Sequence, residues 1–211
     1  MGFTYGPEPD AIDSELFATG YFQYIFYFWT YCYFGTIRHM GARAAALGTT
    51  VLFVMVTITS PLGGWISDRL SESVGRKLGR RIVAMGSLLL APVCLLLATR
   101  LTDHLMVGAA VSIAMGFAGT CEGPFWASAI DIGGSGVGAA CGILNGGGNA
   151  GGFLGPLLTP IIASFAGWSW GVNVACLLSV AGGLVLLGVD PTQRVTGGVA
   201  TGAVSESILL S

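Results

Sequence analysis

One acid stands out among the few side chains in this sequence that could carry chemistry. Glu122 lies within a long apolar stretch, and Trp126 follows four residues later. On a helix, this spacing places both side chains on one face. A carboxylate inside a bilayer is costly, so it must face a cavity or carry a proton. We expect Glu122 to handle a proton or a substrate beside Trp126, although a polar cap near the helix irregularity at Pro124 explains it equally well.

A nucleophilic serine is the other chemistry to consider. Ser135 lies between two glycines, but a serine protease within the membrane needs a histidine in hydrogen-bond reach. His39 and His104 lie at predicted helix ends on the opposite side, so a protease is a remote alternative. Residues 133–138 are rich in glycine but lack the Lys-Ser/Thr of a phosphate-binding loop, and no strand precedes them. We therefore expect no enzymatic activity, no bound cofactor and no metal.

The composition of the chain indicates the class of protein that holds these residues. Charged residues make up 9% of the 211 residues and hydrophobic residues 53%. An ordinary soluble domain has about 25% charged residues, and this chain has too few to cover a soluble surface. The net charge of -2 gives no sign of nucleic-acid binding. The composition therefore predicts a membrane protein.

Six apolar runs are long enough for a membrane-spanning helix, which needs about 20 residues. They cover residues 16–36, 45–66, 82–100, 105–130, 137–165 and 168–189. The runs are continuous and do not alternate, which disfavours the strands of a barrel. We predict an all-α polytopic membrane protein with six transmembrane helices over 16–190. A cytoplasmic lead-in over 1–15 precedes them, and a disordered cytoplasmic tail over 191–211 follows.

Basic residues indicate the orientation of the chain. The loop after the second run holds five of the nine Lys and Arg residues. Loops rich in Lys and Arg stay on the cytoplasmic side. We therefore predict that both termini are cytoplasmic and that the protein lies in the cell (inner or plasma) membrane.

The same loop carries a recognisable signature. Residues 64–69 read Gly-Trp-Ile-Ser-Asp-Arg, and residues 79–81 read Gly-Arg-Arg. This resembles the Gly-x-x-x-Asp-Arg and Gly-Arg-Arg/Lys loop of the major facilitator superfamily, which implies transport by alternating access. Close helix approach and charge pairing would form a cytoplasmic latch that holds one conformation. The latch would consist of Gly64, Asp68, Arg69, Arg80 and Arg81. An ordinary basic loop is the alternative.

Two further segments resemble one branch of that superfamily. Residues 125–131 read Phe-Trp-Ala-Ser-Ala-Ile-Asp, and residues 138–145 read Gly-Ala-Ala-Cys-Gly-Ile-Leu-Asn. They are similar to the tenth and eleventh helices of the anion:cation symporters, which include sugar-acid permeases and organic-anion carriers. The match covers about residues 15–190, as the C-terminal six of a usual twelve helices. The resemblance implies one half of a proton symporter for an organic anion, such as a hexonate or hexuronate.

The resemblance also implies substrate contacts. Trp126 matches a tryptophan that lines the substrate cavity in related permeases. Asn145 matches an asparagine that forms hydrogen bonds with substrate there. An amide offers donors and an acceptor without adding charge, although an interhelical hydrogen bond would also explain Asn145. One or two aromatic residues of the first helix, Tyr27 or Tyr31 for example, are expected to reach the cavity.

The resemblance to these symporters also predicts the binding partners of the chain. Substrate would lie between two six-helix halves, and no Arg or Lys of this chain lies deep inside a span. We expect as partners a small organic anion, a proton, the lipid bilayer, and a complementary N-terminal half or a second copy. A truncated fragment without transport activity is the alternative.

Glycines at four-residue spacing in two rows predict close helix packing. They are Gly138, Gly142 and Gly146 in the first row, and Gly151 and Gly155 in the second.

Overall fold

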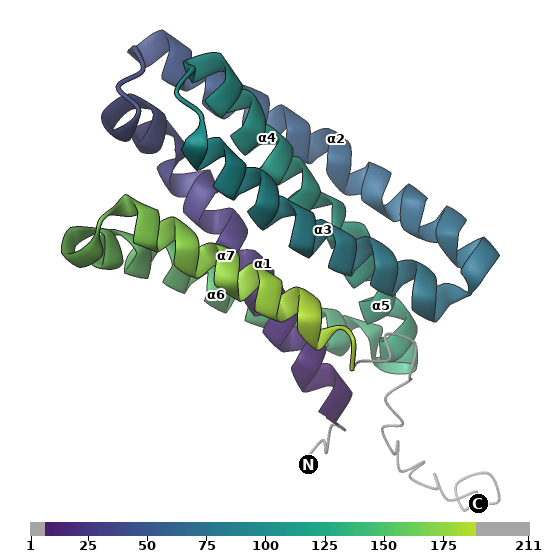
Figure 1. The fold of residues 1–211 in the computed structure, drawn as a ribbon. Coiled ribbons are helices and arrows are strands. Elements are labelled where there is room, and N and C mark those ends of the chain that lie inside the picture. Colours follow the sequence, from purple (N-terminus) through teal and green to yellow (C-terminus); the bar gives the residue numbers. More distant parts are fainter. Residues whose placement is uncertain (1–6, 189–211) are drawn as a thin grey trace, which may run out of the picture.

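The computed structural model describes residues 7–188, which form a bundle of helices without a strand (Figure 1). The helices are α1 (Pro7–Cys32), α2 (Ala42–Val74), α3 (Arg76–Arg100), α4 (His104–Thr120), α5 (Glu122–Gly133), α6 (Val137–Ala166) and α7 (Trp168–Val185). A π-helical turn, Tyr33–Ile37, follows α1, and a 3-10 turn, Gly134–Gly136, joins α5 to α6. The predicted all-α fold class is confirmed. The predicted tail lies outside the described residues, and the predicted lead-in does so in part, because α1 begins at Pro7.

Helix length and composition agree with a membrane location. Five stretches within residues 7–188 are long and apolar enough to cross a membrane: α2, α3, His104–Asp131, α6 and α7. The helix α1 is not in this set, because its tyrosines and Gln23 lower its mean hydropathy. Only 11% of the most apolar part of α2 is buried in the bundle, compared with 56% for His104–Asp131. The rest of the α2 surface needs lipid or another protein to cover it.

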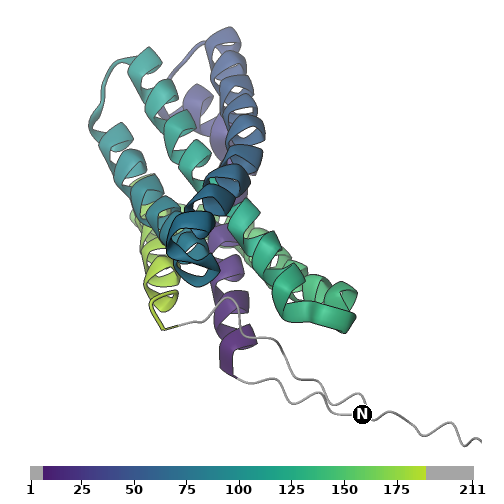
Figure 2. The ribbon, with the colours of Figure 1, turned by 90° about the vertical axis from the view of Figure 1, so that its right-hand side faces the viewer.

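The helices run alternately up and down, with α4 and α5 together forming one pass, so α1 begins and α7 ends at the same end of the bundle (Figure 1). The turn between α2 and α3 also lies at this end, which we call the basic end because it carries residues 69–81. Two views show α4 running beside α2 and α3, and α1 running beside α6 and α7 (Figures 1 and 2). Gly75 and Gly167, both with φ of 88°, make the turns after α2 and α6; glycine adopts this conformation without strain.

Close backbone contact joins α1 to α6 through glycines. A Cβ atom added at Gly151 would lie 2.0 Å from the carbonyl oxygen of Phe17, and one added at Gly20 would lie 2.0 Å from that of Gly148. The two backbones therefore touch, as in small-residue packing between membrane helices. Gly155 also packs against α1.

The remaining glycines of the predicted packing rows face outward. An added Cβ atom would meet nothing within 4 Å at any of three positions: Gly138, Gly142 and Gly146. Within residues 7–188, close packing therefore uses Gly151 and Gly155, and Gly138, Gly142 and Gly146 have no neighbour there.

The predicted span 105–130 is divided into two helices. The helix α4 ends at Thr120 and α5 begins at Glu122, with Cys121 in the turn between them. Pro124 has no N–H group to donate to the carbonyl of Thr120, four residues earlier. This break places the backbone of Glu122 inside the bundle at a helix terminus.

Candidate functional site

Three helices meet at the carboxylate of Glu122. Gln23 of α1 donates a hydrogen bond from Nε2 to Oε1 at 3.2 Å, and Ser60 of α2 donates one from Oγ to Oε2 at 2.8 Å. Gln23 is buried. Hydrogen bonds to an ionised group are stronger than neutral ones, and within residues 7–188 no basic side chain pairs with Glu122. The carboxylate thus connects α1, α2 and the break before α5.

Glycines bring α2 close to this break. A Cβ atom added at Gly63 would lie 2.0 Å from the carbonyl oxygen of Thr120, and one added at Gly123 would lie 2.5 Å from the Cα atom of Gly64. The short distance between the helices allows the Ser60 hydroxyl to reach Glu122. Gly64, predicted for the latch, therefore also packs against the helix break.

An aromatic surface continues from the Glu122 group. The Tyr27 ring, one turn after Gln23, stacks on Phe53 of α2 with ring centroids 5.3 Å apart. Tyr24 lies 5.5 Å from Tyr27 between ring centroids, and its hydroxyl donates to Oδ1 of Asn149 on α6 at 3.4 Å. Contacts between side chains therefore run from α2 across α1 to α6.

The other predicted substrate residues lie apart from this network. Trp126 on α5 is 44% exposed, and Tyr31 near the end of α1 is 48% exposed. Asn145 is exposed, and its side chain has no hydrogen-bond partner in residues 7–188. No hydrogen bond or ring contact in that part of the chain joins these three residues to Glu122.

Sequence reasoning missed two partners of Glu122. Gln23 is a buried amide in a helix that is otherwise rich in aromatic residues, and a polar group at such a position was the available signal. Ser60 gave a weaker signal, because serine often satisfies itself within a membrane helix.

The ion pair at the basic end differs from the predicted latch. Nη1 of Arg80 lies 2.8 Å from Oδ2 of Asp131, and Nη1 of Arg76 lies 3.5 Å from the same oxygen. The Arg80 side chain is only 9% exposed. Asp131 directly follows the predicted span 105–130 and was not among the predicted latch residues. The contact joins the start of α3 to the end of α5.

The other predicted latch residues lie at the surface or near it. Asp68 is exposed and has no ion-pair or hydrogen-bond partner in residues 7–188. Arg69 lies 3.9 Å from Glu72, measured from Nη1 to Oε2, and its guanidinium lies 5.7 Å from the Trp65 ring centroid. Arg81 is half-buried.

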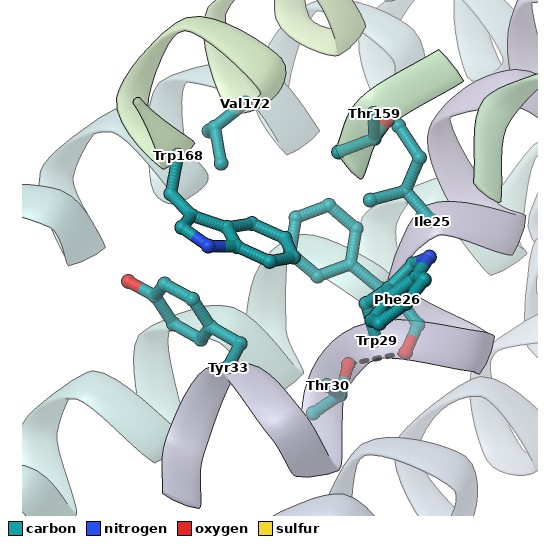
Figure 3. A pocket seen from close by; sticks show the side chains of 8 residues that line it. All are labelled: Ile25, Phe26, Trp29, Thr30, Tyr33, Thr159, Trp168 and Val172. Carbon is teal, nitrogen blue, oxygen red and sulfur yellow. Dashed lines mark hydrogen bonds between the residues drawn. The ribbon is translucent and has the colours of Figure 1, made fainter. Parts of the chain in front are cut away.

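A small hollow lies between α1, α6 and α7, toward the other end of the bundle (Figure 3). Its lining is Ile25, Phe26, Trp29, Thr30, Tyr33, Thr159, Trp168 and Val172. Trp29 donates from Nε1 to the carbonyl of Pro156 at 3.1 Å. The dashed line in Figure 3 is the bond from the Thr30 hydroxyl to the carbonyl oxygen of Phe26. No charged side chain is among these lining residues.

Comparison with known families identifies the family of this chain. A profile of the Major Facilitator Superfamily matches residues 16–207. The chain belongs to the major facilitator superfamily. Members of this superfamily are membrane transporters and not enzymes, so transmembrane transport is the general function of the chain. The comparison with curated proteins found no match. Superfamily membership and the apolar helices make the chain an integral membrane protein.

The arrangement of the bundle also bears on the protease alternative. His39 follows α1 and His104 begins α4, both at the end opposite the basic end. The turn Gly134–Gly136, which holds Ser135, lies at the basic end (Figure 1). A catalytic serine and its base must be in hydrogen-bond reach, and the length of the bundle separates these turns.

Proposed function

We propose that the chain forms one half of a proton symporter for an organic anion, with a sugar acid such as a hexonate or hexuronate as the favoured substrate. The observation that carries the proposal is the exposed amide of Asn145, which has no partner in residues 7–188 although it lies within the membrane-spanning length of α6. Such an amide can bind a carboxylate or a hydroxyl. The resemblance of residues 125–131 and 138–145 to anion:cation symporters supports the substrate class.

Alternating access requires a second body. We propose that a complementary six-helix half, or a second copy, covers the open side of α2 and α6, with substrate bound between the two bodies. Trp126 and the aromatic surface around Tyr27 would line the cavity. The Arg80–Asp131 pair would take part in the latch at the basic end, and its rearrangement would accompany the change of conformation.

Uptake into proteoliposomes tests this function. The chain is reconstituted with and without a matching N-terminal half, and uptake of galactonate and glucuronate is measured under a proton gradient. We expect uptake only when both halves are present and the inside is alkaline. Failure of the complete pair to move any organic anion would contradict the proposed substrate class. Under the alternative of an inactive fragment, no partner half would restore uptake.

Two substitutions test the substrate contacts. We expect Asn145→Ala and Trp126→Ala each to raise the apparent KM of the active pair about 5- to 10-fold, because each removes a contact worth about 1 kcal/mol or slightly more. The matched control is Asn173→Ala, which removes an amide from α7. An unchanged KM in both site variants would refute the assignment of Trp126 and Asn145.

A further inference from the structure

We propose that Glu122 is the site in this chain that binds the coupling proton, and that Ser60 and Gln23 are its positioning residues. The meaning of this inference for transport rests on the proposed function, but proton binding itself can be measured on the chain alone. It assigns Glu122 to the proton instead of the organic anion. Three observations carry it: the charge balance around the carboxylate, its hydrogen bonds, and its position at a helix break.

Within residues 7–188, Glu122 has no counter-ion. On α2, no residue between Arg43 and Asp68 is titratable, and α6 contributes only Cys141. The titratable groups near Gln23 and Glu122 in sequence are Tyr21, Tyr24 and Tyr27 on α1 and Cys121 before α5, and none of them carries a positive charge.

Basic residues reach α5 only at its far end. Arg76 and Arg80 of α3 lie at Asp131, nine residues after Glu122, which is about 13 Å of helix. An ionised Glu122 would therefore leave a negative charge within the membrane without a cation beside it, which is strongly unfavourable. A proton from solution balances that charge.

The hydrogen bonds of α2 indicate where the Ser60 hydroxyl can bond once Glu122 is protonated. Four hydroxyl groups of this helix donate to a backbone carbonyl one turn earlier: Thr49, Thr50, Thr57 and Thr59. Ser60 differs, because its hydroxyl donates to Glu122 at 2.8 Å. A protonated Glu122 can itself donate to the Ser60 oxygen, which frees the Ser60 hydroxyl to bond to its own helix, as its neighbours do.

Protonation thus weakens the attachment of two helices to the break. The bonds from Ser60 and Gln23 lose their assistance from charge when Glu122 becomes neutral. At Gly63 and Gly123 the backbone of α2 lies in close contact with the backbone at the break around Cys121, with no side chain of these two glycines between them. The junction where the proton binds is therefore also a point where the two helices can move against each other.

The same carboxylate couples the proton to an anion. An ionised Glu122 repels an anionic substrate on the adjoining aromatic surface, and a neutral one does not. By linkage, a bound proton raises the affinity for the anion by the factor by which the anion raises the affinity for the proton. We expect a factor of roughly 5 to 150, the usual range of such coupling.

Infrared difference spectroscopy tests proton binding. The full chain in lipid nanodiscs is titrated from about pH 9 to about pH 5, a range that stays above the ordinary pKa of an exposed glutamate, about 4.3. We expect the carbonyl band of a protonated carboxylic acid to appear on acidification and to be missing in Glu122→Gln. The matched control, Glu72→Gln, replaces an exposed glutamate and should keep the band. A band that persists in Glu122→Gln, or no band in the native chain, would overturn the inference.

The positioning role has its own measurement. Ser60→Ala removes a hydrogen-bond partner of the Glu122 carboxyl group, so the stretching frequency of its carbonyl band should shift. Thr57→Ala, which removes a hydroxyl bonded to its own helix, should leave it unchanged. Equal shifts in both variants would contradict a positioning role for Ser60. If added sodium removes the carboxylic acid band at constant pH, sodium competes with the proton at Glu122, and the inference that the proton is the coupling ion is overturned.

Separate outcomes distinguish this inference from the proposed function. If Glu122 binds a proton but the reconstituted pair takes up no organic anion, the proposed function fails and the proton site stands. If uptake occurs while Glu122 gives no band at any pH tested, the inference fails and the proposed function stands.

Discussion

Replacement of Asp131 by asparagine is expected to lower the free energy of unfolding by about 3 kcal/mol, because one partner of a buried ion pair is removed. The guanidinium of Arg80 is nearly buried, and its Nε atom has no hydrogen-bond partner in residues 7–188. The carboxylate of Asp131, with Oδ2 2.8 Å from Nη1, therefore balances the positive charge of Arg80. The Asp131 side chain is 28% exposed, so some water remains and the loss should lie at the lower end of the range for buried pairs. Unfolding of the chain in detergent micelles measures the loss.

Two variants make this prediction specific. Asp68→Asn changes an exposed acid at the same end of the bundle, and we expect less than about 0.5 kcal/mol of change. The double variant Arg80→Gln/Asp131→Asn should recover part of the stability, because it removes the buried charge together with its partner. Equal losses in Asp68→Asn and Asp131→Asn would show that net charge at the basic end matters and the pair does not.

The contrast between Asp68 and Asp131 shows how far the sequence predicts the ion pairs. The basic loop and its signature pointed to an ionic cluster that contains Arg80, and the structure has one. The acid could not be chosen from the sequence, because Asp68 is close to Arg80 along the chain while α2 continues to Val74 and leaves Asp68 on the helix surface. The partner comes from α5, and only the packing of α3 against α5 brings it there.

The same limit applies to the Glu122 site. Hydropathy located the apolar runs, and Pro124 with its glycine neighbours indicated an irregular helix where the structure has a break. The partners of Glu122 are 99 and 62 residues away in sequence. Ser60 reaches Glu122 because Gly63 and Gly123 allow α2 to pass close to the helix break. The sequence pattern of one helix does not indicate which other helices it crosses.

Alanine at two glycines of α6 is expected to change stability in opposite directions. Gly142→Ala should raise the free energy of unfolding by about 0.5–1 kcal/mol, because an added Cβ meets nothing within 4 Å and alanine favours a helix over glycine. Gly151→Ala should lower it by about 2 kcal/mol or more, since overpacking against rigid neighbours usually costs about 1–3 kcal/mol and outweighs the gain in helix propensity. Its Cβ would lie 2.0 Å from the Phe17 carbonyl oxygen and 2.9 Å from the Tyr21 nitrogen.

Both glycines belong to rows with the same four-residue spacing, so the sequence assigns them the same packing role. The difference arises because the row that contains Gly151 faces α1, whereas Gly142 faces away from the bundle. Unfolding of both variants in dilute micelles measures the two effects. If Gly142→Ala is also destabilising, and more so at higher protein concentration, then the outward row packs against a second copy of the chain. Destabilisation independent of concentration would instead contradict the open environment of Gly142.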